Sequence, residues 1–114
     1  MKILILGYSK IARKRIIDVL IKKKISFCIA SKSSKNNLKQ AYSWFRNYDE
    51  ALKRSKADLV YVSLPNSLHY KWSRKALINN YHVIVDKPLA ENLFKTKKLL
   101  TLAKKKKKLL SEAT

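Results

Sequence analysis

Three short segments of this sequence carry residues whose types and spacing suit ligand binding and proton chemistry. They are GYSKIA at residues 7–12, PNSLH at 65–69 and DKP at 86–88. The first holds the only glycine of the 114-residue chain. A glycine turn lets backbone N–H groups approach a phosphate, and a lysine ammonium can stabilise developing alkoxide charge. Whether these groups meet depends on the elements that carry them.

The glycine segment resembles the dinucleotide-binding turn G-x-G-x-x-G/A, with Gly7, Ser9 and Ala12 at its three fixed positions. Gly7 falls where a strand turns tightly into a helix, and Ala12 is small enough for close packing of that helix on the sheet. Ser9 departs from the pattern, because its side chain occupies the place where the backbone normally approaches a pyrophosphate. Alone, the turn is compatible with nucleotide binding or with a purely structural glycine.

Strands and helices alternate along the chain. Apolar, β-branched and aromatic runs predict strands at 2–6, 25–31, 44–48, 58–65 and 81–86. Helical spacing predicts a helix over 10–24, with Ala12, Ile16, Val19 and Leu20 on its buried face. Further helices are expected early in the 38–56 region, over 49–55, from a cap at Asn66 or Ser67 to 79, and over 92–107.

This alternation predicts an α/β fold, a three-layer doubly wound parallel sheet of about five strands plus part of a sixth. The sixth strand is expected to begin in the closing segment LLSEAT. Ligands of such sheets bind beyond the carboxyl ends of the strands. Gly7 and Lys87 follow predicted strands at that edge, and Pro65 ends one.

The two later segments carry a resemblance to a known family. The chain resembles the N-terminal half of the NAD(P)-dependent oxidoreductases called Gfo/Idh/MocA, after glucose-fructose oxidoreductase, inositol dehydrogenase and a rhizopine-catabolism protein. In that family the fourth strand ends in P-N-x-x-H and the fifth in E-K-P. The matching residues here are Pro65, Asn66 and His69, then Asp86, Lys87 and Pro88. The resemblance covers essentially all 114 residues and implies an NAD(P)-binding Rossmann fold.

The resemblance also implies roles for matching residues. Pro65 and Asn66 would line the nicotinamide ribose, and Lys87 would be the catalytic group, joined to Pro88 by a cis peptide bond. Without this pattern, Lys87 would be interpreted as a surface lysine before a turn proline. Asp86 is one methylene shorter than the glutamate of the family. His69, in the first turn of a helix, is expected to cap or pack rather than act as a general base.

The cofactor is expected to be NADP(H), with NAD(H) as the alternative. NAD-specific folds place a carboxylate about 20 residues beyond the glycine turn, where it accepts the ribose hydroxyls. This chain has Ser31, Lys32 and Ser33 there, which offer hydroxyls and an ammonium to a 2′-phosphate. The expected cofactor-binding residues are Gly7, Tyr8, Ser9, Lys10, Ile11, Ser31, Lys32, Ser33, Leu64, Pro65, Asn66, His69, Asp86, Lys87 and Pro88.

Composition limits the kinds of partner, metal site and cellular compartment that this protein could have. The formal net charge is +20, from 27 Lys+Arg against 7 Asp+Glu, which raises the possibility of nucleic-acid binding. Lysines lie along nearly every predicted helix, and the sequence contains no RNA-binding signature. We therefore expect these lysines to form solvated helix faces and expect no specific nucleic-acid partner. The single cysteine, Cys28, and the absence of zinc-ligand spacing predict no metal site and a reducing compartment, hence a cytoplasmic protein. No apolar run reaches membrane-spanning length.

Members of the family have a second α/β domain that builds much of the substrate site and often the oligomer interface. The resemblance therefore predicts that residues 1–114 are the dinucleotide-binding domain and that the substrate domain is absent from this chain. A sugar or polyol substrate, catalysis and oligomerisation are expected only with that second domain. Two alternatives stay open at this point, a stand-alone nucleotide-binding module and a basic nucleic-acid-binding protein.

Overall fold

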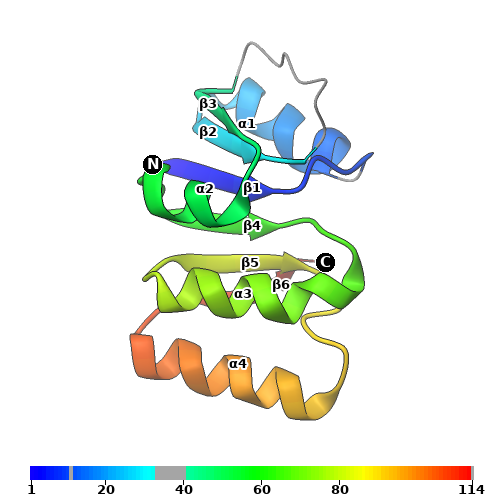
Figure 1. Ribbon diagram of the computed structural model, residues 1–114. Helices are drawn as coiled ribbons and strands as arrows, with labels where there is room; N and C mark the ends of the chain where they lie inside the picture. Colours follow the sequence, from blue (N-terminus) through cyan, green and yellow to red (C-terminus); the bar gives the residue numbers. More distant parts are fainter. Residues whose placement is uncertain (11, 33–40, 114) are drawn as a thin grey trace.

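The computed structural model describes residues 1–10, 12–32 and 41–113 (Figure 1). Its strands are β1 (Lys2–Leu6), β2 (Ser26–Ala30), β3 (Ser43–Phe45), β4 (Leu59–Val62), β5 (His82–Asp86) and β6 (Leu110–Ala113). Its helices are η1 (Ala12–Ile17), α1 (Asp18–Lys22), α2 (Tyr48–Arg54), η2 (Asn66–Leu68), α3 (His69–Ile78) and α4 (Leu93–Lys106). Within these ranges, no helix is long and apolar enough to cross a membrane.

The six strands form one sheet in the order β3-β2-β1-β4-β5-β6, and every neighbouring pair is parallel. This is the strand order of a doubly wound dinucleotide-binding sheet, so the predicted fold class is confirmed. The chain runs outward from β1 to β3 and then crosses to β4 on the other side of β1. The carboxyl ends of β1 and β4 are therefore adjacent, with Leu6 opposite Val62.

Helices cover both faces of the sheet, which explains why β1 is a continuous apolar run. Leu4 and Leu6 belong to the larger core, with residues of α2, α3 and α4. Ile3 and Ile5 point to the opposite face and join the smaller core beneath η1 and α1. Figure 1 shows α2, α3 and α4 together in front of the sheet. An edge-to-face contact of Tyr48 with Trp72, with ring centroids 5.1 Å apart, joins α2 to α3.

The first helix differs from its prediction. It begins as the π-helical segment η1 and continues as the short α1. Val19, expected in the core, is 44% exposed, whereas Ile17 is 2% exposed. A π-turn holds one more residue than an α-turn, so the buried position after Ala12 is five residues later rather than four. The α-helical period therefore assigned the wrong residue to the core.

Other boundaries also shift. The third strand is shorter than predicted, because Tyr48 already belongs to α2. Neither Asn66 nor Ser67 caps a helix through its side chain, since they lie in the 3₁₀ turn η2 that precedes α3. Asn92 does cap α4, and its Oδ1 accepts the Lys95 backbone N–H at 2.9 Å. The helix expected early in the 38–56 region lies partly outside the described residues.

We predict that two neighbouring leucines of α4 differ sharply in their contribution to stability. Leu99 is 1% exposed in the larger core and Leu100 is 49% exposed. Leu99→Ala should lower the free energy of unfolding by about 2–5 kcal/mol, because it leaves a cavity. Leu100→Ala, the matched control, should change it by about 0.5 kcal/mol or less. Urea denaturation followed by circular dichroism measures both, and equal losses would contradict this packing of α4.

Candidate functional site

A cleft of about 290 Å³ lies at the carboxyl ends of β1, β4 and β5. It is at the point where the strand order reverses, the place at which doubly wound sheets bind ligands. The residues that line it are Ser9, Ser63, Leu64, Pro65, Asn66, His69, Asp86 and Lys87. Parts of all three segments singled out in the sequence are therefore neighbours in space.

Gly7 is required by two independent features of the turn after β1. Its φ is +100°, a conformation that L side chains rarely adopt. A Cβ added at this position would lie 2.2 Å from the backbone oxygen of Ser63, at the end of β4. Because this oxygen belongs to the backbone of Ser63, it cannot move aside as the end of a flexible side chain could. The single glycine of the chain thus allows the ends of β1 and β4 to approach each other.

A directed chain of hydrogen bonds crosses these strand ends. The Ser63 hydroxyl donates to Asp86 Oδ2 at 2.7 Å, so its oxygen is left to accept from the Ser9 hydroxyl, 2.6 Å away. Ser9 Oγ in turn accepts the backbone N–H of Ala12 at 3.0 Å. The serine that departs from the glycine pattern is therefore tied to the aspartate that departs from the glutamate pattern.

Asp86 receives a second hydroxyl donor on its other side. Tyr61 donates its phenolic hydrogen to Asp86 Oδ1. Burial raises the pKa of Tyr61, and the hydrogen bond to Asp86 and the charge of that carboxylate raise it further. Tyr61 therefore stays protonated and remains a donor. With both carboxylate oxygens bonded, Asp86 is fixed at the end of β5, directly before Lys87.

His69 lies beneath the surface of the cleft. It is fully buried, with Nε2 placed 2.6 Å from the Leu64 carbonyl oxygen and Nδ1 placed 2.6 Å from that of Pro88. The expectation that this histidine packs within the fold agrees with these contacts. Both ring nitrogens bond backbone of the protein itself, which leaves neither for proton transfer to a ligand.

Lys87 is exposed at the cleft, and the peptide bond to Pro88 is cis, as the family resemblance implied. The segment that follows it is held from two sides. His69 bonds the Pro88 carbonyl, and Glu112 of β6 accepts the Leu89 backbone N–H at 2.7 Å. A long cationic side chain thus extends from a backbone whose position is fixed.

Four further predicted positions, Tyr8, Lys10, Ser31 and Lys32, lie along the same edge, toward β2. Tyr8 and Lys10 follow Gly7, and the Tyr8 ring makes an edge-to-face contact with Trp44, with centroids 5.1 Å apart. Ser31 is buried directly after β2, and Lys32 is exposed with Nζ 5.6 Å from the centre of the Tyr48 ring. The predicted positions Ile11 and Ser33 lie outside the described residues.

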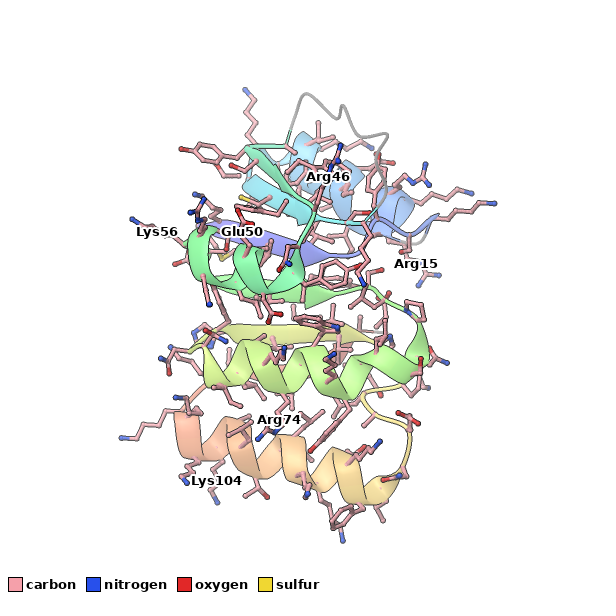
Figure 2. The ribbon with its side chains drawn as sticks, in the orientation of Figure 1. Arg15, Arg46, Glu50, Lys56, Arg74 and Lys104 are labelled. Carbon is pink, nitrogen blue, oxygen red and sulfur yellow. The ribbon has the colours of Figure 1, made fainter. Side chains whose placement is uncertain are left out.

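Basic side chains are widely distributed over the molecule. Figure 2 shows Arg15, Lys56 and Lys104 pointing outward from different parts of the fold. In the described ranges, the side-chain ion pairs are three exposed contacts, Arg54 with Glu50, Lys75 with Asp49, and Lys95 with Glu91. Exposed pairs of this kind contribute little to stability. No group of metal-ligating side chains is found among the described residues.

Sequence reasoning missed three residues that build the site, Tyr61, Ser63 and Glu112. Tyr61 and Ser63 are two positions apart at the end of β4, so the period of a strand directs both to one side, toward Asp86. That spacing was a usable signal. Glu112 gave none, because its bond to Leu89 depends on β6 pairing with β5.

Comparisons with known proteins agree with this geometry. The family model described as "Oxidoreductase family, NAD-binding Rossmann fold", Gfo/Idh/MocA, matches residues 1–114. A dTDP-3,4-didehydro-2,6-dideoxy-alpha-D-glucose 3-reductase of Streptomyces violaceoruber is 35% identical over 88 residues, 74% of this chain and 26% of that protein. The protein of the same name from Saccharopolyspora spinosa is 42% identical over 65 residues, 57% of this chain and 20% of that protein.

A solved structure shares the fold over almost the whole chain. KijD10, a 3-ketoreductase from Actinomadura kijaniata solved with NADP and TDP-benzene, has a TM-score of 0.89 and 27% identity, covering 98% of this chain and 36% of that one. The chain thus spans about a quarter or less of the length of these two sequence relatives and about a third of the solved structure.

Replacing Gly7 should damage both the fold and the cleft. We expect Gly7→Val to lower the free energy of unfolding by about 2–4 kcal/mol, because the positive φ and the contact with Ser63 both penalise a side chain. Dinucleotide binding should also be lost. The control is Lys24→Gly, where φ is 55°, which should be neutral or stabilise by up to about 1 kcal/mol. Chemical denaturation measures the stabilities, and a Gly7→Val protein as stable as the parent would contradict the packing described.

Proposed function

Because this chain belongs to the Gfo/Idh/MocA oxidoreductase family and has its NAD-binding Rossmann fold, we propose that it is the cofactor-binding half of a hydride-transferring enzyme. Its substrate would be a hydroxyl or carbonyl group of a sugar or polyol. The observation that carries this proposal is the convergence of the glycine turn, Pro65, Asn66 and Lys87 on one cleft at the strand ends. Such a cleft offers both a phosphate-binding turn and a polar group beside it.

The residues present fit a nicotinamide dinucleotide, which supplies or accepts the hydride when it is bound. The turn of residues 7–10 would hold the pyrophosphate, since Gly7 keeps this backbone free of a Cβ and the helical segment η1 begins at Ala12. Pro65 and Asn66, exposed beside the cleft, would line the nicotinamide ribose. The Ala12 N–H is already bonded to Ser9 Oγ, so the phosphate would depend on other donors of the turn.

Lys87 is the group that we assign to the reacting oxygen. Its ammonium can donate a hydrogen bond to a substrate hydroxyl or carbonyl and stabilise the negative charge that develops there. Fixed hydrogen bonds on Asp86, Pro88 and Leu89 hold the backbone on both sides of it. Such anchoring reduces the reorganisation that the reaction requires.

The relatives support a sugar-type substrate. Two are reductases of a dTDP-linked sugar, and KijD10 is a 3-ketoreductase. The chain covers only part of each, so we propose that a further domain supplies the other wall of the substrate site and any oligomer interface. The lone thiol of Cys28, free and buried, fits a cytoplasmic location for that enzyme.

We further propose that the dinucleotide is NADP(H). Between β2 and β3 the sequence has no carboxylate to accept the ribose hydroxyls of NAD. Ser31 and Lys32 follow β2 directly, and the Lys32 side chain is exposed at the carboxyl edge of the sheet. An ammonium there favours a 2′-phosphate.

The cofactor preference can be tested by reversing one charge. Wild type should bind NADPH more tightly than NADH, and Lys32→Glu should weaken NADPH binding about tenfold or more, since a charge-assisted contact contributes roughly 1.5–3 kcal/mol. Lys56→Glu makes the same charge change at an exposed site before β4, at the other edge of the sheet, and should have little effect. Fluorescence titration gives the affinities. Equal binding of NADH and NADPH by wild type would refute the preference.

The role of Lys87 requires an activity measurement. The 114-residue chain should bind the dinucleotide without turnover, because one open wall cannot orient a substrate within the roughly 3–3.5 Å that hydride transfer needs. In a longer form that includes the substrate domain, Lys87→Ala should lower kcat about a hundredfold with unchanged dinucleotide affinity.

Lys97→Ala on α4 is the matched control for that experiment. The assay follows reduced-nicotinamide absorbance with a panel of sugars and polyols. Robust turnover by the 114-residue chain would refute the division of the site between two domains. An unchanged rate in Lys87→Ala would refute the assignment of the lysine.

A further inference from the structure

The imidazole of His69 is a tightly held polar group outside the proposed chemistry. It is 0% exposed at the first residue of α3. Its Nε2 lies 2.6 Å from the carbonyl oxygen of Leu64, and its Nδ1 lies 2.6 Å from that of Pro88. Both distances are at the short end of the hydrogen-bond range. The ring therefore spans two carbonyl oxygens that are 24 positions apart in the sequence, on either side of the cleft wall.

Both partners of the ring are backbone carbonyl oxygens, so each ring nitrogen must donate a hydrogen for both contacts to be hydrogen bonds. A backbone carbonyl oxygen only accepts hydrogen bonds, and a neutral imidazole carries one N–H and one lone pair. A neutral ring would thus satisfy one carbonyl and direct a lone pair at the other, at a separation where two acceptors repel. Only a ring with hydrogen on both nitrogens makes two favourable contacts, and these two contacts must offset the cost of burying the positive charge that the second hydrogen brings.

The two carbonyls belong to the loops that carry the candidate site residues. Leu64 directly precedes Pro65 and Asn66, whereas Pro88 directly follows Lys87. The charged groups that share the cleft with His69 are Asp86 and Lys87. Both carboxylate oxygens of Asp86 already accept hydroxyl hydrogens from Tyr61 and Ser63. Among the residues that the structure describes, His69 is thus the one whose side chain bonds both loops.

We propose that His69 is a positioning residue that carries hydrogen on both ring nitrogens and holds the Lys87 loop at a fixed distance from the loop of Pro65 and Asn66. The P-N-x-x-H segment is then one unit with the D-K-P segment, since the histidine of the first bonds the proline of the second. The ring does not touch the reacting atoms. It acts by setting the spacing between the groups that do.

The protonation of the ring can be measured in the 114-residue chain without any ligand. Selective ¹⁵N labelling of histidine gives two rings, because the chain contains only His69 and His82. His82 is an internal control of opposite type, since its Nδ1 accepts the Leu109 N–H at 3.0 Å. Near neutral pH, His69 should show two protonated nitrogens and His82 an unprotonated Nδ1. Assignment uses His82→Gln, and a single neutral tautomer at His69 would overturn the proposal.

The positioning role needs a second experiment, which rests on the proposed function. His69→Phe keeps an aromatic ring but removes both donors, and it should weaken NADPH binding about tenfold, because the two loops lose their common contact. His82→Gln should bind NADPH as wild type does. Normal NADPH affinity in a folded His69→Phe protein would overturn the positioning role.

The outcomes of the two experiments are distinguishable. If wild type itself fails to bind NADPH, the proposed function is wrong, while the ¹⁵N spectrum still decides the protonation of His69. If His69→Phe fails to fold, His69→Gln provides the replacement, since one carboxamide N–H can reach one carbonyl but not both. That variant should show intermediate affinity, and wild-type affinity there would count against the proposal.

Discussion

The close approach of β1 to β4 at Gly7 is the constraint on which the rest of the site depends. Only a residue without Cβ permits the backbone of Gly7 to lie against that of Ser63. This contact brings the Ser9 hydroxyl to that of Ser63 and, through it, to Asp86 at the end of β5. One glycine therefore aligns three strand ends that are far apart in the sequence. A sheet without this contact would have the same strand order but a different cleft.

Two polar systems then fix the wall of the cleft. The hydroxyls of Ser63 and Tyr61 donate to the Asp86 carboxylate, and the Ser9 hydroxyl joins them through Ser63. His69 bonds the carbonyls of Leu64 and Pro88. Most of these groups are buried or partly buried, where an unpaired polar atom would be costly. The exposed side chains of Pro65, Asn66 and Lys87 stand on this rigid base. Such an arrangement separates residues that hold the site from residues that would meet a ligand.

Much of the fold could be predicted because its signals are local. Continuous apolar strands, the helices between them and the proline after β4 indicated a doubly wound sheet, and the family resemblance supplied the cis Lys87–Pro88 bond. The phase of the first helix could not be predicted, since the π-helical turn moves the buried position from the α-helical period to Ile17. The second carbonyl partner of His69 is equally non-local, because Pro88 reaches it only through the packing of β5 beside β4.

We propose above all that the cleft at the carboxyl ends of β1, β4 and β5 binds a nicotinamide dinucleotide. Titration of the ¹⁵N-labelled chain with NADPH, followed residue by residue in amide NMR spectra, tests it most directly. We expect saturable shifts at Gly7, Ser9, Asn66 and Lys87, with little change at Lys24 and Asn80 in turns at the opposite edge of the sheet. Shifts concentrated at that opposite edge, or none at saturating NADPH, would contradict it.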